Sequence, residues 1–416
     1  MLPEEMWTLK ELFVYPNEYI YWSAQIVMYP FMTGLVAGAF VLSSLYHLFG
    51  IKQLKEIARF SLVLSFALLM VAPLPLLLHL MQPQRNIYIF MTPHFTSAIA
   101  AFGVVLFVYA SIVASEIWFL YRKYIVERSL ALKQKFGKDF ADSIRYLIYT
   151  VLTLGSFDIT EKAIQQDRRA IRILAGVGIP VACFLHGYAG FVFGSVKANA
   201  LWMTPLMPVI FIASAIVSGV ALCAFTYIVA MEIKKFRVSH PKASEVQASR
   251  QKMEGIETRV VVITVRYLVV FLIFSISLEL LDLVFRGYTA VKSWDILRNV
   301  IYEKDFVNIF ILQYAVGNLV PFILLLMPRL TIRRATVALF LVIFGVFMMR
   351  WNVVIGGQSF SLTFSGYMSY LMPMIPRDFE TYKEGLFGVL TVVALPFIFF
   401  WILSRVLPLF ETTTPE

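Results

Sequence analysis

The sequence contains few of the residues that bind metals or form disulfides. Among its 416 residues there are two cysteines and five histidines. An iron–sulfur cluster held by four thiolates is therefore excluded. Cys183 and Cys223 both lie inside apolar runs, and we interpret them as packing residues rather than as a disulfide or a pair of ligands.

Charged residues are scarce as well. They make up 15% of the chain, whereas 59% is hydrophobic and the mean hydropathy is +0.76. A soluble domain cannot bury so much apolar surface, but membrane helices satisfy their own backbone hydrogen bonds. The apolar runs are long and do not alternate with polar residues, which excludes a β-barrel. The sequence therefore predicts an all-α polytopic membrane protein.

Motifs that indicate soluble cofactor chemistry are missing. We find no P-loop, no dinucleotide-binding fingerprint and no nucleophile elbow. The histidines do not suit a haem between two helices, because His47, His79 and His186 are expected at different depths and His94 lies in a loop. We expect no covalently bound cofactor and no metal.

Nine apolar stretches are long enough to cross a bilayer, at about 20 residues per crossing. They are residues 22–48, 58–80, 95–121, 171–195, 203–231, 260–285, 305–327, 335–356 and 384–407. Basic loops alternate with others: 122–170 carries ten Lys or Arg and 232–259 carries seven, whereas 81–94 carries only Arg85. This alternation predicts an N-terminus outside and a C-terminus inside.

The same basic loops account for the net charge of +10, so this charge indicates membrane topology and lipid contact rather than binding of nucleic acid. Residues 1–19 are acidic and the first apolar run is too long for a cleavable leader. A short apolar run within 139–157 is flanked by basic residues, and we expect an interfacial or cytoplasmic helix there.

Ionisable residues inside the apolar stretches are costly in lipid and are candidates for a proton relay. They are Glu116, His186, Arg266, Glu279, Asp282 and Arg350. Structural alternatives remain open: His186 as a hydrogen-bonded core residue, and Glu116 and Arg266 as side chains that reach the inner surface. Because Arg350 shares its expected depth with two acids, we predict that it pairs with Glu279 or Asp282.

Five segments of the sequence resemble a known family. They are YPFMTGLVAGAF at 29–40, HLMQPQRNIYIFMTPHFTSAIA at 79–100, ILAGVGIPVACFLHGYAGFVF at 173–193, WMTPLMPVIFIASAIVSGVAL at 202–222 and RWNVVIGGQ at 350–358. In this order they resemble the helices of the NrfD / polysulfide reductase (PsrC-like) membrane-subunit family. Within it, the chain looks closest to the QrcD-like subunits of the quinone reductase complex.

The resemblance implies two four-helix bundles plus a peripheral helix in the bacterial inner membrane. We divide the chain accordingly into a first bundle, residues 1–231, which contains the pocket, and a second bundle with the peripheral helix, residues 232–416. The resemblance also implies that the protein has no prosthetic group. It further implies a quinone pocket at the outer face of the first bundle and an extracytoplasmic four-cluster-type iron–sulfur partner. The narrower group implies a multihaem cytochrome c, a molybdopterin-family-like subunit and menaquinone as the substrate that is reduced.

Family members with a carboxylate in the second helix lead us to expect one in the pocket, yet no acid lies between Arg59 and Arg85. His79 is then the ionisable candidate. Because reduction of a quinone consumes two protons, and His titrates near neutral pH, we assign His79 as the catalytic proton donor.

The expected pocket joins His79 with side chains that can hydrogen-bond a quinone carbonyl. We expect Gln25 and His79 to face the head group, with Tyr21, Arg85 and His94 at the rim. Tyr21 has a simpler alternative role in an interfacial aromatic belt. Two other classes remain open for the whole protein: a secondary transporter with a midplane site, and a membrane anchor without a site of its own.

Overall fold

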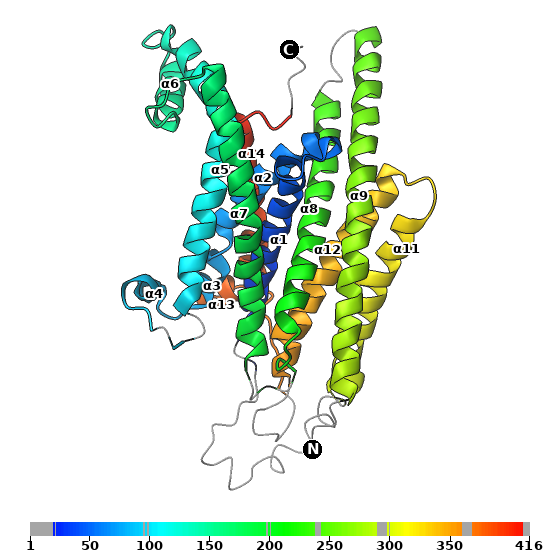
Figure 1. Cartoon of the computed structure of the whole chain (residues 1–416). Helices are drawn as coiled ribbons and strands as arrows, with labels where there is room; N and C mark the ends of the chain where they lie inside the picture. Colours follow the sequence, from blue (N-terminus) through cyan, green and yellow to red (C-terminus); the bar gives the residue numbers. More distant parts are fainter. Residues whose placement is uncertain are drawn as a thin grey trace.

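The computed structural model describes the chain as a set of long, nearly antiparallel helices (Figure 1). The described residues are 20, 22–94, 96–97, 100–196, 199, 201–237, 243–288, 298, 300–359 and 368–410. Within them, nine helices are long and apolar enough to cross a membrane. The prediction of an all-α polytopic protein is confirmed.

The first bundle consists of α1, α2 with its continuation α3, α5 and α7. Their bounds are Ala24–His47, Lys55–Val71, Leu74–His79, Ala100–Lys133 and Glu161–Gly194. Short 3-10 helices η2 (Lys52–Leu54) and η3 (Pro83–Ile87) and the short helix α4 (Tyr88–Met91) lie in the connections. The four helices form a closed group, because each packs against the next: α1 against α2, α2 against α5, α5 against α7, and α7 against α1.

The second bundle consists of α8, α9, the pair η5–α11, and α12. Their bounds are Met207–Arg237, Ala243–Tyr288, Val307–Leu319 with Val320–Leu326, and Ile332–Val354. Both η4 (Val300–Lys304) and η5 are π-helices, and the 3-10 helix η6 (Gly356–Gln358) follows α12. Helix α8 packs against α1 and α7 as well as against α9 and α12, so it belongs to the seam between the bundles.

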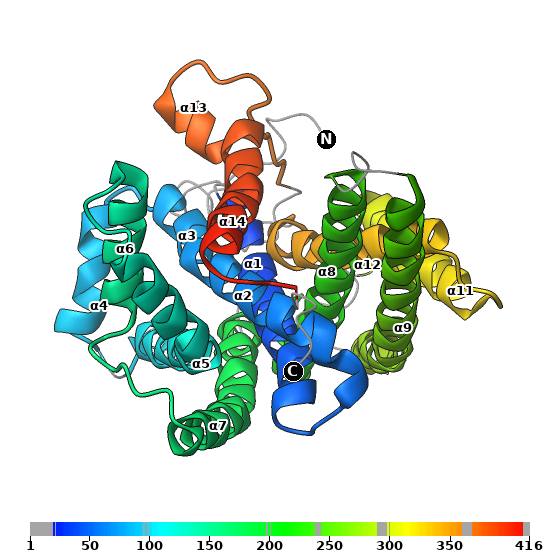
Figure 2. The same cartoon turned by 90° about the horizontal axis from the view of Figure 1, so that it is seen from above.

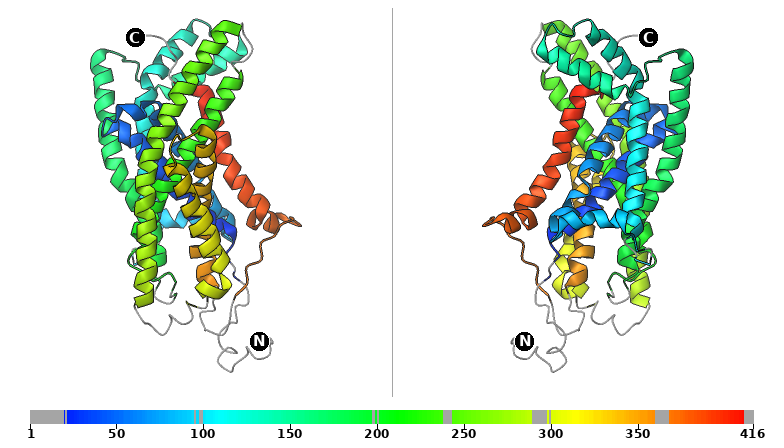
Figure 3. Two further views of the ribbon diagram at one scale, coloured as in Figure 1. Left: turned by 90° about the vertical axis from the view of Figure 1, so that its right-hand side faces the viewer. Right: turned by 90° about the vertical axis from the view of Figure 1, so that its left-hand side faces the viewer.

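The last two helices return to the first bundle. They are α13 (Phe379–Glu384) and α14 (Leu386–Val406). Helix α14 packs against α2, and α13 packs against α3. Figures 2 and 3 show this pair outside the two bundles, with α14 running obliquely and α13 at its far end. The sequence division at residue 231 stays a prediction, but in space the C-terminal helices cover the first bundle.

Helix ends are set by local chemistry. Ser23 and Thr160 are N-caps, and their hydroxyl oxygens accept hydrogen bonds from the amides of Gln25 and Ala163 at the start of α1 and α7. The sequence Pro73–Leu74–Pro75 separates α3 from α2, because proline lacks the amide that a helix interior requires. This break sets the position of α3, which ends at His79.

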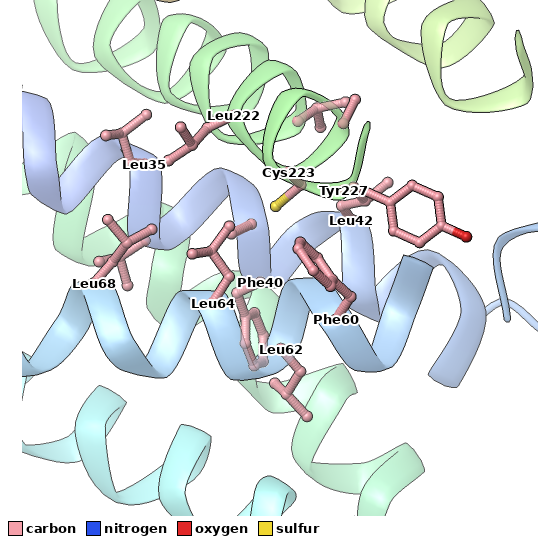
Figure 4. Close-up of a cluster of buried hydrophobic side chains, with 14 of the residues drawn as sticks. Leu35, Phe40, Leu42, Phe60, Leu62, Leu64, Leu68, Leu222, Cys223 and Tyr227 are labelled. Carbon is pink, nitrogen blue, oxygen red and sulfur yellow. The ribbon is translucent and has the colours of Figure 1, made fainter. Parts of the chain in front are cut away.

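The core of the first bundle lies between α1, α2 and α8. Figure 4 shows Leu35, Phe40 and Leu42 of α1 near Phe60, Leu64 and Leu68 of α2, with Cys223 of α8 among them, while Leu62 points to the other side of α2. Cys223 is fully buried and, like Cys183, is a free thiol. Its surroundings fit the interpretation as a packing residue.

Close contacts between helices rely on glycine at a few positions. A Cβ at Gly38 would lie 2.2 Å from the carbonyl oxygen of Ala215 in α8, and one at Gly317 would lie 2.2 Å from the Cα of Gly345. Small residues let membrane helices approach in this way. The expected short helix in 139–157 is α6, Phe140–Leu152, which packs beside α5 and is too short to span.

Candidate functional site

His79 lies where three parts of the chain meet. Its Nδ1 is 3.1 Å from Oε2 of Glu384 in α13 and 3.2 Å from the hydroxyl of Ser23 at the start of α1. The ion pair is partly exposed, with 21% and 23% of the two side chains accessible. We call this region, defined by Ser23, Gln25, His79 and Glu384, the His79 end of the molecule.

Gln25 is fully buried beside this group. Its amide nitrogen donates to the carbonyl oxygen of Lys383 at 2.6 Å, and its Oε1 has no hydrogen-bond partner among the described residues. Gln25 and His79 thus contact consecutive residues of α13. Nearby, the hydroxyl of Tyr370 accepts the amide proton of Ala24 at 2.8 Å.

The carboxyl of Glu384 is held in its ionised form. Partial burial alone would raise its pKa, but hydrogen bonds from His79 and Ser23 and the positive charge of Lys383 outweigh this, so that the pKa of Glu384 is lowered. An ionised carboxylate can only accept hydrogen bonds, so Nδ1 of His79 donates to it. In the described part of the chain, Nε2 of His79 has no protein partner. This nitrogen is available to a ligand.

The predicted rim residues lie further out. Arg85 is exposed in η3, and His94 is exposed after α4, where its Nδ1 lies 2.7 Å from the hydroxyl of Thr96. Within the described residues, neither side chain is hydrogen-bonded to His79 or Gln25. Tyr21 lies outside the described residues. The role of these three residues at a quinone rim stays a prediction.

Sequence reasoning missed the contribution of α13. The sequence predicts a site walled by the first four spans, yet Glu384, Lys383 and Tyr370 come from the C-terminal part of the chain. The available signal was an acidic residue at the very start of the last apolar stretch. Without knowledge that α14 returns to α2, nothing linked this acid to a histidine 305 positions earlier.

Arg350 lies in the seam between the bundles and is fully buried. Its guanidinium donates to Nε2 of His186 at 2.9 Å and to the hydroxyl of Ser214 at 2.7 Å, and it lies 3.8 Å from the centre of the Phe211 ring. The predicted ion pair of Arg350 with Glu279 or Asp282 is wrong.

The two acids have other partners in the second bundle. Glu279 accepts a hydrogen bond from the amide of Gln313 at 2.9 Å, and Asp282 pairs with Arg286 at 2.8 Å. The reason is the face of α12. Arg350 and Asn352 are two positions apart, about 200° around a helix, so Asn352 contacts Gln313 while Arg350 faces α7 and α8.

The tautomer of His186 follows from its neighbours. Because a guanidinium can only donate, Nε2 of His186 must accept and cannot carry a proton. The proton is then on Nδ1, which lies 3.3 Å from the hydroxyl of Thr33, and this hydroxyl donates to the carbonyl oxygen of Tyr29 at 3.1 Å. A neutral imidazole thus links α1, α7 and α12.

The remaining relay candidates are separate. Glu116 is fully buried in α5, and neither of its carboxyl oxygens has a partner within the described parts of the chain. Arg266 is exposed on α9, and its alternative role at the inner surface stays a prediction. The six candidates therefore form several groups rather than one continuous chain of contacts.

Some cavities lie at the opposite end of the spans from His79. One of about 600 Å³ lies between α8, α9 and α12 beside Lys235, Glu257 and Arg333, and one of about 650 Å³ lies along α9. Neither borders His79 or Gln25. In the described residues, no three His, Cys, Asp or Glu side chains are placed to hold a metal ion.

Comparison with known proteins identifies the family of the chain. Residues 15–362 match the family described as "Polysulphide reductase, NrfD". The chain belongs to the NrfD family. This match includes both bundles and ends before α13, so Glu384 lies outside it.

Two relatives illustrate this NrfD membership. The chain is 32% identical over 219 residues to a selenate reductase subunit of Mesobacillus selenatarsenatis, covering 51% of this chain and 49% of that protein. It is 26% identical over 357 residues to a putative dimethyl sulfoxide reductase membrane subunit of Halobacterium salinarum, covering 83% of this chain and 69% of that protein. The aligned part thus spans about half the length of the first relative.

Proposed function

We propose that this NrfD protein is the quinone-interacting membrane subunit of an oxidoreductase complex. The quinone head group binds at the His79 end of the first bundle, on the extracytoplasmic side of the bacterial inner membrane. Electrons pass between it and an iron–sulfur partner docked at that surface. The names of the two relatives, both of them subunits of reductases, support a molybdopterin-type catalytic protein in the same complex.

One observation carries the proposal. Two polar atoms, Nε2 of His79 and Oε1 of Gln25, have no protein partner in the described structure, although they lie at the end of an apolar bundle. An unpaired and buried polar atom such as Oε1 of Gln25 is costly, and a ligand with a hydrogen-bond donor removes that cost, whereas the partly exposed Nε2 of His79 is free to bond to a ligand. A quinone provides carbonyl acceptors when oxidised and hydroxyl donors when reduced.

The chemistry consists of two electrons from the partner and two protons. His79, as imidazolium, donates one proton from Nε2 to a quinone oxygen and is reprotonated from water, and water at the same surface supplies the second proton to the other quinone oxygen. We further propose menaquinone as the substrate, its reduction as the direction, and a multihaem cytochrome c as the donor to the iron–sulfur partner. Proton translocation, if coupled, would use Glu116 or the His186–Arg350 group, which are buried in the spans.

The test is turnover of a menaquinone analogue by the purified complex carrying His79→Phe. We expect the variant to assemble and its partner's haems or clusters to be reduced by the donor, while electron transfer to quinone is lost. Gln25→Leu should weaken quinone binding. Wild-type turnover in the His79 variant would exclude the site.

A secondary transporter is the alternative. The observation in its favour is a buried polar group in the second bundle, where Glu279, Gln313 and Asn352 are hydrogen-bonded beside the π-helix η5. Purification separates the two: a transporter is isolated without redox partners, whereas the proposed redox protein is isolated with them.

A further inference from the structure

We infer that Glu384 is a positioning residue for the quinone site: it fixes the imidazole of His79 with Nδ1 toward the protein and Nε2 toward the substrate. The inference rests on the proposed function and adds to it a residue outside the 15–362 family match.

The position of Glu384 is defined by a rigid corner of the chain. Helix α13 begins with a capping box in which Asp378 and Thr381 bond reciprocally. It ends at Glu384, and the next residue is Gly385, where a Cβ would lie 2.4 Å from the carbonyl oxygen of Pro373. The amide of Leu386 donates to that same oxygen at 3.0 Å. These contacts hold the Glu384 carboxylate against α3.

The charges around His79 favour a single role for this carboxylate. The groups that face the imidazole from the packed elements are Glu384 and the hydroxyl of Ser23, with Lys383 and Tyr370 next to them. The ammonium of Lys383 is bound to Glu380 at 2.8 Å, and the hydroxyl of Tyr370 accepts from Ala24. Glu384 is thus the one carboxylate in direct contact with His79 in the described structure.

This arrangement determines what His79 can do. With Nδ1–H donated to the carboxylate, the neutral imidazole presents a lone pair at Nε2, and the imidazolium presents an N–H there. In the reduction, the Nε2–H bond breaks and an O–H bond forms on the quinone as electrons arrive from the iron–sulfur partner. Glu384 stays ionised and stabilises the imidazolium before the transfer, but it does not touch the quinone.

Three substitutions separate charge from geometry. Glu384→Gln keeps a hydrogen-bond acceptor without the charge, and Glu384→Asp keeps the charge on a shorter side chain. Glu380→Gln is the matched control, because Glu380 is in the same helix, is 63% exposed and contacts Lys383 rather than His79.

The experiment measures quinone turnover by the assembled complex from pH 5 to 9, together with reduction of the partner's own redox centres. In Glu384→Gln we expect turnover to fall about ten- to a hundredfold. The pH profile should also move to lower pH, because the imidazolium has lost its counter-charge. Glu384→Asp should retain the wild-type pH profile, and Glu380→Gln should match wild type in both respects.

The double variant His79→Phe/Glu384→Gln should be no slower than His79→Phe alone, since residues that act as a unit are not additive. A Glu384→Gln complex with the wild-type pH profile would overturn the inference, as would full additivity in the double variant.

If His79→Phe itself turns over quinone normally, the proposed function fails. If only the Glu384 variants behave as wild type, the positioning role fails alone. Should Glu384→Gln not assemble, turnover by Glu384→Asp decides: the shorter side chain should position His79 less well and lower turnover, and wild-type turnover would contradict the role.

Discussion

The guanidinium of Arg350 lies 2.9 Å from Nε2 of His186, within the seam between the two helix bundles. No carboxylate touches this guanidinium among the described residues; its partners are an imidazole, a hydroxyl, the Met349 sulfur, the Phe211 carbonyl oxygen and the Phe211 ring. A planar group that forms several hydrogen bonds at once and stacks on a ring cannot be replaced by an ammonium.

We therefore expect Arg350→Lys to destabilise the protein in detergent. Each buried group left without its partner should cost about 1–3 kcal/mol, and His186 and Ser214 would both be affected. Thermal unfolding followed by tryptophan fluorescence measures the effect. Arg266→Lys, at an exposed position of α9, is the control and should leave the midpoint unchanged. Equal midpoints for both variants would show that the Arg350 contacts contribute little.

Gly38→Ala should weaken the packing of α1 on α8. The added methyl would lie 2.2 Å from the Ala215 carbonyl oxygen and 2.8 Å from the Cα of Gly219, both backbone atoms that a side-chain rotation cannot move. Overpacking of this kind costs about 1–3 kcal/mol. Gly176→Ala is the matched control in α7, because its nearest neighbour would be Cδ1 of Leu48 at 3.5 Å. Detergent unfolding should distinguish the two, and a neutral Gly38→Ala would contradict the close contact.

The docking of α13 should depend on acid pH. The pKa of Asp378 is lowered by hydrogen bonds from Thr381, and the pKa of Glu384 is lowered by those from His79 and Ser23 against the effect of burial. A carboxyl whose pKa is lowered in the folded protein contributes its full stabilisation when the pH is above the ordinary pKa of the group, about 4. This stabilisation is lost as the pH falls through the lowered pKa.

Amide exchange of residues 379–384, corrected for the intrinsic effect of pH, should therefore rise below about pH 4. In Glu384→Gln this acid-dependent rise should be smaller, since one of the two titrating groups is gone. Protection that stays constant down to about pH 2 would contradict the prediction.

Topology across the membrane is open to a labelling test. Alternation of basic loops predicts that Gln84 in η3 faces the outside and Lys138, between α5 and α6, faces the inside. Single cysteines at these two exposed positions, introduced after replacement of Cys183 and Cys223, should react with an impermeant maleimide from opposite sides. Labelling of both from the same side would overturn the assignment.

The sequence predicted the helices well because length and hydropathy are local properties. All nine stretches coincide with helices long enough to span, and the short run at 139–157 is a short helix. The position of a residue along its helix follows from the same counting: Arg350 lies near the C-terminal end of α12, which coincides with the predicted span 335–356. Its depth in the membrane stays a prediction.

The face of a helix was harder to predict than the position along it. The sequence pairs Arg350 with Glu279 because their depths agree, but the rotation of α12 turns Arg350 toward α7 and α8. Glu384 escapes prediction for a related reason. Its contact with His79 depends on the return of α14 to α2, which no local pattern in the sequence indicates.

The return of the C-terminal helices also affects when the protein is completed during synthesis. His79 and Glu384 are 305 positions apart, which corresponds to about 15–60 s at ribosomal rates of about 5–20 residues per second. At the start of that interval only the first two spans have been made, and the partner of His79 is translated only at its end. The His79 end of the molecule is therefore completed only with the last two helices, and a chain arrested before α13 lacks the contact between His79 and Glu384.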